Sequence, residues 1–111
     1  MSMLDQEALE ILRDVMDDEF ESLVHRYVRD SDERFPLMRN ECAAADLEAL
    51  RHTVHSFKGA SSNICAPALA AQAQRIEDAA RLGQDDGLLQ QIDDLERAYI
   101  VVREALIALL D

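Results

Sequence analysis

The segment HTVHSFKGASSN, residues 52–63, gathers the side chains of this chain that are best suited to chemistry. His55 is followed by a lysine after three positions and by a glycine after four, inside a stretch whose apolar residues recur at helical spacing. On a helix with about 100° per residue, His55 lies away from the apolar stripe that contains Val54 and Phe57. We therefore expect its imidazole to point to solvent.

The neighbours of His55 on the same side of this helix indicate what the imidazole could do. Gly59 costs roughly 0.5–1 kcal/mol in a helix interior relative to alanine, and clearing space for an incoming group is a reason to keep it. Lys58, one turn on, and Arg51, one turn before, supply positive charge for an anion on the ring, and Ser62 shares their arc. This combination suits a phosphoryl carrier, because a neutral imidazole has a nucleophilic nitrogen.

Size and charge narrow the classes of function. The 111 residues predict one compact domain, residues 1–111, with a single core. The 11 Lys and Arg against 23 Asp and Glu give a formal net charge of -12, and such a field repels nucleic acid and anionic membranes. We expect a protein partner, with no nucleic acid and no membrane among the partners.

Cysteine usage and the start of the chain bear on the compartment. Cys42 and Cys65 form no CxxC motif, and a chain with this much apolar content needs no disulfide, so we expect free thiols in a reducing compartment. The first residues are acidic where a signal peptide would be basic, and no apolar run reaches about 18 residues. These features predict a cytoplasmic protein, and we expect a monomer.

Helical periodicity covers almost the whole chain, and no convincing strand pattern interrupts it. A short first helix is expected from about Asp5 to Val15, and we expect it to act as a lid. Its inner side is predicted to include Leu4, Ala8, either Ile11 or Leu12, and Val15. A longer pattern begins near Asp17. It keeps its phase across Pro36, which favours one kinked helix over two.

Three further helices follow. The third starts after Asp46, a good N-cap residue, the fourth has Pro67 in its first turn, and Gly83 closes it. The last helix has the cleanest stripe, from Leu88 to Leu109. Because the connections are short, sequential helices must be antiparallel. The expected fold is all-α, an up-and-down antiparallel four-helix bundle with an additional short N-terminal helix.

Three segments of the chain resemble one known family. HSFKGASSNICA is similar to the signature of histidine-containing phosphotransfer (HPt) domains, whose usual form is H-x-L/F-K-G-S/A-S-x-x-L/I-G-A. The downstream RIEDAAR resembles the family's L-E-x-x-A-R, and VMDDEF with RYVRDSDERF resembles its second helix. The resemblance covers about residues 4 to 109 and points most closely to the single-domain, HptB-like members.

The resemblance implies a role for individual residues. His55 matches the phosphorylated histidine, and Lys58 and Gly59 match its two supporting positions. Ser61 matches the family's small residue on the buried side, which lets the neighbouring helix approach. The departure is Cys65, where the family commonly has glycine, and it concerns how the third helix ends.

The resemblance also implies the reaction and its partners. HPt domains accept a phosphoryl group from the aspartate of one receiver domain and donate it to that of another. The expected partners are the receiver domain of a hybrid sensor histidine kinase and the receiver domain of a response regulator, in bacterial two-component signalling. The receiver supplies Mg²⁺, so no cofactor is expected on this protein. No glycine-rich nucleotide motif occurs in the chain, which predicts a phosphocarrier without autokinase activity.

Other interpretations of the same residues remain open. A helical adaptor that binds protein through this surface without being phosphorylated is the alternative function. His52 lacks a lysine and a glycine at the right offsets, and His25 lies beside an apolar stripe, so both suit surface or packing roles. A metal site from His52, His55 and the cysteines is less favoured, because structural zinc needs four ligands and both cysteines lie near apolar stripes.

Overall fold

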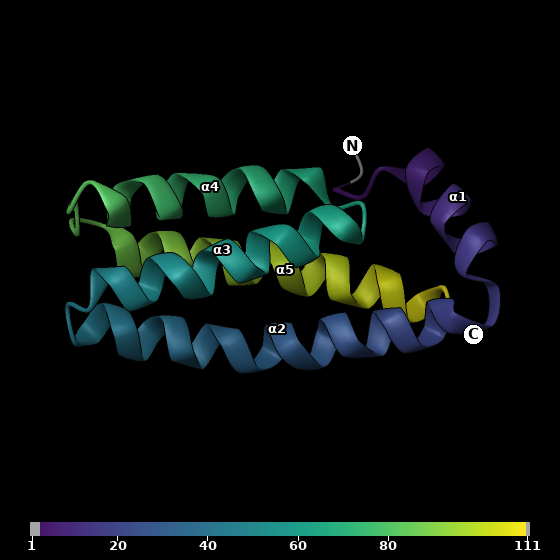
Figure 1. Ribbon diagram of the computed structural model, residues 1–111, viewed down its shortest axis with the longest axis horizontal. Helices are drawn as coiled ribbons and strands as arrows, with labels where there is room; N and C mark the ends of the chain where they lie inside the picture. Colours follow the sequence, from purple (N-terminus) through teal and green to yellow (C-terminus); the bar gives the residue numbers. More distant parts are fainter. Residues whose placement is uncertain (1–2, 111) are drawn as a thin grey trace.

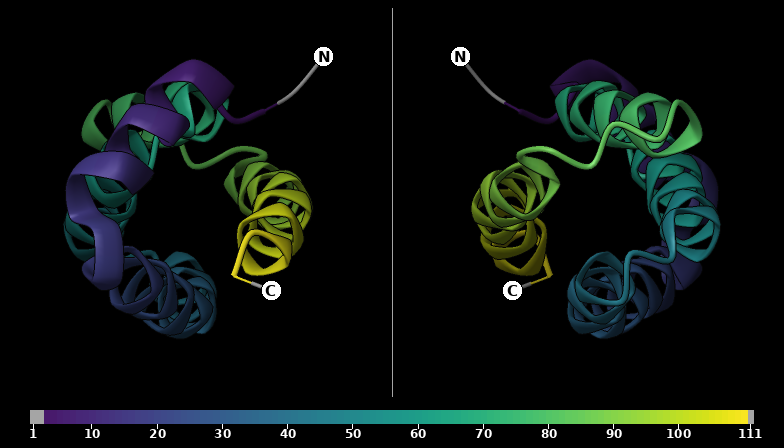
Figure 2. Two further views of the ribbon diagram at one scale, coloured as in Figure 1. Left: turned by 90° about the vertical axis from the view of Figure 1, so that its right-hand side faces the viewer. Right: turned by 90° about the vertical axis from the view of Figure 1, so that its left-hand side faces the viewer.

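The computed structural model describes residues 3–110, which form helices joined by short turns and contain no strand. The elements are α1 (Gln6–Met16), the short 3-10 helix η1 (Asp17–Glu19), α2 (Phe20–Ala43), α3 (Leu47–Asn63), α4 (Pro67–Arg81) and α5 (Leu88–Ala108). Helices α2 to α5 run up and down around a common core, and α5 closes the ring against α2 (Figures 1 and 2). The expected four-helix bundle with an additional N-terminal helix is confirmed.

The core of the bundle is centred on four aromatic rings from α2, α3 and α5. Neighbouring centroids lie between 5.2 and 6.3 Å apart, and the rings belong to Tyr27, Phe35, Phe57 and Tyr99. Ser61 is buried beside them, and its Oγ lies 2.8 Å from Oη of Tyr27. This hydrogen bond satisfies two polar groups that burial would otherwise penalise, and it joins α3 to α2. Ser61 is therefore on the buried side, as the sequence predicts.

Helix α1 lies across one end of the bundle, where it covers the turn between α3 and α4 (Figure 1). The backbone N–H of Asp5 donates to the carbonyl of Cys65 at 2.8 Å, and Leu9 is buried. The predicted inner side of this helix is wrong at Val15, which is 76% exposed. Of the two residues left as alternatives, Leu12 packs against the core and Ile11 is 60% exposed. A crossing helix buries the residues that face the bundle's end, and these need not follow its longest apolar stripe.

Helix α2 continues through Pro36 without a break in its helical assignment. The prediction of one helix is confirmed, since the apolar stripe from Phe20 to Met38 stays buried on both sides of the proline. The helix begins at Phe20, after η1, and so starts later than the predicted position near Asp17. None of the helices among the described residues has the length and apolar character of a membrane span.

Both ends of α3 are held by local hydrogen bonds that fix where its functional face points. Asp46 is the N-cap, and its side chain accepts a hydrogen bond from the N–H of Ala49 at 3.1 Å. At the other end the N–H of Ala66 donates to the carbonyl of Ser61, and Cys65 has a φ of 65°. This is the Schellman pattern with cysteine in the left-handed position that glycine favours. Cys65 thus ends α3 in the way a glycine would.

The end of α2 uses the same pattern with an alanine. Ala45 has a φ of 55°, and the N–H of Asp46 donates to the carbonyl of Glu41 at 2.9 Å. We expect Ala45→Gly to increase the free energy of unfolding by roughly 0.5–1 kcal/mol, because glycine adopts this conformation without steric cost. Urea unfolding measures the change. Ala44→Gly is the matched control, since Ala44 has an ordinary φ of -81°. Equal effects of the two substitutions would contradict the prediction.

Candidate functional site

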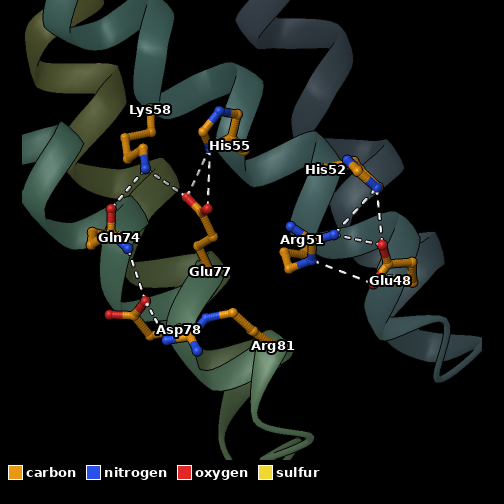
Figure 3. Close-up of polar contacts among 9 residues, drawn as sticks. All are labelled: Glu48, Arg51, His52, His55, Lys58, Gln74, Glu77, Asp78 and Arg81. Carbon is orange, nitrogen blue, oxygen red and sulfur yellow. Dashed lines mark hydrogen bonds and ion pairs between the residues drawn. The ribbon is translucent and has the colours of Figure 1, made fainter.

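His55 lies on the outer face of α3, and its side chain is 62% exposed. The predicted orientation toward solvent is confirmed. Its Nδ1 atom lies 3.1 and 3.2 Å from the two carboxylate oxygens of Glu77 on α4 (Figure 3). The ring is therefore exposed but oriented by a contact from the neighbouring helix.

Glu77 joins His55 to Lys58. The Nζ atom of Lys58 lies 2.8 Å from Oε1 of Glu77 and donates to Oε1 of Gln74 at 2.7 Å (Figure 3). Side-chain exposure is 12% for Glu77 and 22% for Lys58, so this ion pair is partly shielded from water. The sequence predicts an ammonium group beside the imidazole, and the structure adds a carboxylate between the two. These three side chains therefore form a His–Glu–Lys cluster that spans α3 and α4.

The contact with Glu77 determines which nitrogen of His55 is free. An ionised carboxylate can only accept hydrogen bonds, so Nδ1 must carry the proton in this contact. In the neutral ring Nε2 then has an unshared electron pair, and Figure 3 shows this second nitrogen on the side of the ring away from Glu77. The arrangement presents Nε2 to solvent as a nucleophile.

The pKa of Glu77 reflects the same cluster. Burial acts to raise it, but hydrogen bonds from Lys58 and His55, together with their charges, outweigh burial and leave the pKa below its ordinary value of 4.5. A carboxyl group with a lowered pKa in the folded state binds protons more tightly after unfolding. It therefore contributes stability above its unfolded pKa and loses that contribution as the pH falls through the folded pKa.

This linkage predicts a pH dependence that can be measured. We expect the free energy of unfolding to decline below about pH 5 in the wild type and to decline less steeply in Glu77→Gln, which has no carboxyl group to protonate at this position. Urea unfolding at a series of pH values measures both slopes. Identical slopes in the two proteins would show that Glu77 does not titrate as the cluster requires.

The surface beside His55 is open at Gly59. A methyl group built on Gly59 would have no heavy atom within 4 Å outside the adjoining backbone of α3, so packing against the rest of this chain does not require glycine there. Ser62, on the same side of α3, is also exposed. The absence of a side chain therefore leaves a low, accessible surface next to the imidazole.

Arg51 lies on α3 one turn before His55, and its charge is shared with a neighbouring carboxylate. It forms an ion pair with Glu48, and Nε2 of His52 lies 3.0 Å from Oε1 of the same carboxylate (Figure 3). Within the part of the chain that the structure describes, Arg51 has no hydrogen bond or ion pair with His55. The expected contribution of its charge at the imidazole is thus reduced by Glu48.

The residues considered as metal ligands do not form a metal site among the described residues. Cys42 and Cys65 are free and partly buried, and the pKa of Cys65 is raised by burial and by the charge of Asp5. Among residues 3–110, no group of three or more His, Cys, Asp or Glu side chains could hold a metal ion. His25 pairs with Glu21 at 3.5 Å on the exposed side of α2.

Two residues of the cluster, Glu77 and Gln74, have no role that the sequence predicts. Glu77 lies within RIEDAAR, and Gln74 precedes that segment by one position. Gln74 also donates to Asp78 at 2.8 Å, which extends the network along α4 (Figure 3). The available signal was helical spacing, since residues three or four apart share a face. That spacing predicts a polar face of α4 but not its contact with His55.

The chain is similar in sequence and in structure to known proteins. A family model described as Hpt domain matches residues 22–111. The crystal structure of histidine-containing phosphotransfer protein B (HptB) from Pseudomonas aeruginosa PAO1 is similar, with 39% sequence identity and a TM-score of 0.92. The match covers 96% of this chain and 92% of that chain. The search of curated proteins finds no match. The similarity thus extends over nearly the whole chain and is not confined to the segment around His55.

Proposed function

Because the chain belongs to the Hpt domain family and is a histidine phosphotransfer protein of a phosphorelay, we propose that His55 is the residue that carries the phosphoryl group. One observation carries this proposal. The ring is 62% exposed, and its Nδ1 is held by Glu77, which leaves Nε2 free and accessible. His52 and His25 instead direct Nε2 to a glutamate.

In the proposed reaction Nε2 of His55 attacks the phosphorus of an aspartyl phosphate on a receiver domain. The N–P bond forms as the P–O bond breaks, and the aspartate leaves as a carboxylate. The ring gains positive charge while the proton stays on Nδ1, and the carboxylate of Glu77 stabilises that charge. The aspartate of a second receiver then attacks the phosphorus, and Nε2 is released unchanged. Mg²⁺ and the acidic pocket belong to the receiver.

The neighbours of His55 have supporting roles in this proposal. The ammonium of Lys58 has three hydrogens, of which Glu77 and Gln74 accept two, so one remains for a phosphoryl oxygen. Gly59 leaves room for the receiver at its exposed position. Ser62 and Arg51 lie on the same α3 surface, where they contact the docked partner.

The proposal extends to partners and compartment. Hpt domains interact with receiver domains, and we assign one receiver to a hybrid sensor histidine kinase and the other to a response regulator. The net charge of -12 supports protein partners over nucleic acid or membrane. The protein acts in the cytoplasm as a monomeric phosphocarrier that binds no cofactor. It does not phosphorylate itself, a proposal supported by the lack of a nucleotide-binding motif in the sequence.

Incubation with phosphorylated receiver domains tests this function. The receivers of the source genome are phosphorylated one at a time with a labelled small phosphodonor and mixed with the purified protein and Mg²⁺. We expect label to move to this protein and to be acid-labile and base-stable, as a phosphorus–nitrogen bond is. A wild-type protein that binds a receiver but takes up no label would support the non-phosphorylated adaptor instead.

Glu77 is a positioning residue in this account, and its replacement has an expected kinetic signature. We expect Glu77→Gln to lower the transfer rate at saturating receiver by about 10- to 100-fold, because the amide neither requires the proton on Nδ1 nor neutralises the charged ring. The apparent KM for the receiver should not change. Stopped-flow or quenched-flow transfer assays separate these two constants.

Glu48→Gln is the matched control for this variant. Glu48 makes the same kinds of contact, with Arg51 and His52, but does not touch His55. Its transfer rate at saturating receiver should equal that of the wild type, and any effect of releasing Arg51 should fall on KM, because Arg51 lies on the docking surface. A Glu77→Gln protein that matches Glu48→Gln in rate, or that changes KM alone, would remove Glu77 from the mechanism.

A further inference from the structure

A groove between α2 and α3 is not used by the transfer mechanism. It has a volume of about 180 Å³ and includes Arg26, Asp30 and Arg34 from α2, with Ala60 and Asn63 from α3. Leu23 and Ile64 provide apolar surface in the same groove. Its size suits one side chain of a partner protein rather than a cofactor.

The groove contains an unsatisfied donor. Nη1 of Arg34 is buried and has no hydrogen-bond partner among the described residues. A buried guanidinium nitrogen without an acceptor costs free energy, and native proteins rarely leave such groups unpaired. Asp30 does not provide the acceptor, because its carboxylate contacts Arg29 at 3.3 Å. Arg34 therefore lacks an anionic partner at the place where it is shielded from water.

The charge of the groove is opposite to that of the protein. Two arginines, Arg26 and Arg34, line it in a chain whose net charge is -12. Neither arginine is in an ion pair within residues 3–110. Complementary charge favours an acidic group as occupant, and a carboxylate matches the planar fork of a guanidinium.

The position of the groove identifies the partner that brings this carboxylate. Asn63 lies eight residues beyond His55 on α3, which corresponds to roughly 12 Å along the helix axis. A standard protein interface buries about 800 Å² on each partner, a patch roughly 16 Å in radius. A receiver domain that docks over His55 and extends toward α2 therefore also covers the groove.

We propose that the groove is a specificity pocket for the receiver domain, in which Arg34 binds an Asp or Glu side chain from the receiver surface. This inference rests on the proposed function, because it requires a receiver docked over His55. The contact lies outside the reacting atoms. It therefore contributes to recognition of the receiver and leaves the chemical step unchanged.

Transfer kinetics of Arg34→Gln test the proposal, with the receiver that labels the wild-type protein fastest as the probe. We expect the KM for this receiver to rise about tenfold or more and kcat to stay at the wild-type value, because a buried charge pair is lost from docking alone. Raising the salt concentration should weaken docking of the wild type more than docking of the variant. Thermal unfolding checks that the variant folds.

Arg97→Gln is the matched control, since Arg97 is an exposed arginine on α5 and does not line the groove. It should behave as the wild type does. Equal KM values for Arg34→Gln and Arg97→Gln would overturn the proposal. Should Arg34→Gln fail to fold, Asn63→Asp decides, because a carboxylate at the groove should compete with the receiver and raise KM. An unchanged KM in that variant would overturn the proposal as well.

Other outcomes separate this inference from the proposed function. If the wild type is labelled through His55 but Arg34→Gln has the wild-type KM, the inference alone fails. If no receiver labels the wild type, both fail together. A wild-type dimer in sedimentation experiments that Arg34→Gln converts to monomers would place a second copy of this chain in the groove and would also overturn the assignment.

Discussion

A His55→Gln variant is expected to take up no phosphoryl group from a phosphorylated receiver, whereas His52→Gln and His25→Gln should be labelled like the wild type. An amide nitrogen is not a nucleophile toward an aspartyl phosphate, so the loss should be complete. The other two histidines direct Nε2 toward Glu48 and Glu21. Only His55 among them combines a held Nδ1 with a nearby ammonium.

The three variants also control for one another. Each replaces a surface imidazole on α2 or α3 with an amide, so effects on stability should be small and similar. Label on the protein is followed through acid and base treatment, together with the rate at which the receiver loses its phosphoryl group. Label that persists in His55→Gln would place the acceptor elsewhere.

A Gly59→Glu variant is expected to fold normally and to transfer about 100-fold more slowly, or slower still. At about 6 Å and an effective dielectric constant of about 20, its carboxylate would raise the energy of a unit negative charge on the phosphoryl group being transferred by about 3 kcal/mol, a factor of more than about 100 in rate. The new side chain would also occupy surface that the receiver must approach. Since a methyl group at this position meets no heavy atom within 4 Å outside the adjoining backbone of α3, the bundle itself can accept the substitution.

Gly59→Ala separates clearance from backbone effects. We expect it to increase the free energy of unfolding by roughly 0.5–1 kcal/mol, because alanine is the better helix former. It should retain most of the transfer activity, since the methyl group is small and uncharged. Circular dichroism, urea unfolding and transfer rates measure both variants. A Gly59→Glu protein with the wild-type rate would contradict the role given to this open surface.

Most of the fold could be predicted because each long helix carries a continuous stripe and clear end signals. The stripe of α5 stays buried from Leu88 to Leu106, and Asp46 caps α3 as expected. The face of α1 could not be predicted in the same way. A helix that lies across the end of a bundle buries residues according to the shape of that end, so Leu9 is buried while Val15 is exposed.

The candidate site could also be predicted only in part. The direction of His55 depends only on the helical repeat of α3, so the sequence was sufficient. The contact between His55 and Glu77 depends on how α3 and α4 are aligned along each other, and ridges-into-grooves packing permits more than one alignment. The pairing of Arg51 with Glu48 was within reach of sequence reasoning, because the two residues are three apart on one helix.

The sequence does not predict how α3 ends at Cys65. The Hpt family commonly has glycine at this position. Cys65 nevertheless adopts the left-handed conformation that glycine favours, with a φ of 65°. The hydrogen bonds from Ala66 to Ser61 and from Asp5 to Cys65 hold this segment from both sides. Tertiary contacts thus override a local conformational preference.

The central claim is that Nε2 of His55 is the atom that bears the phosphoryl group, because Glu77 holds the proton on Nδ1. NMR spectroscopy of the nitrogen-15-labelled, phosphorylated protein tests it directly through the coupling between phosphorus and the bonded ring nitrogen. The structure predicts one phosphohistidine, at His55, with phosphorus on Nε2 and hydrogen on Nδ1. Phosphorus on Nδ1 of His55, or on any other residue, would contradict it.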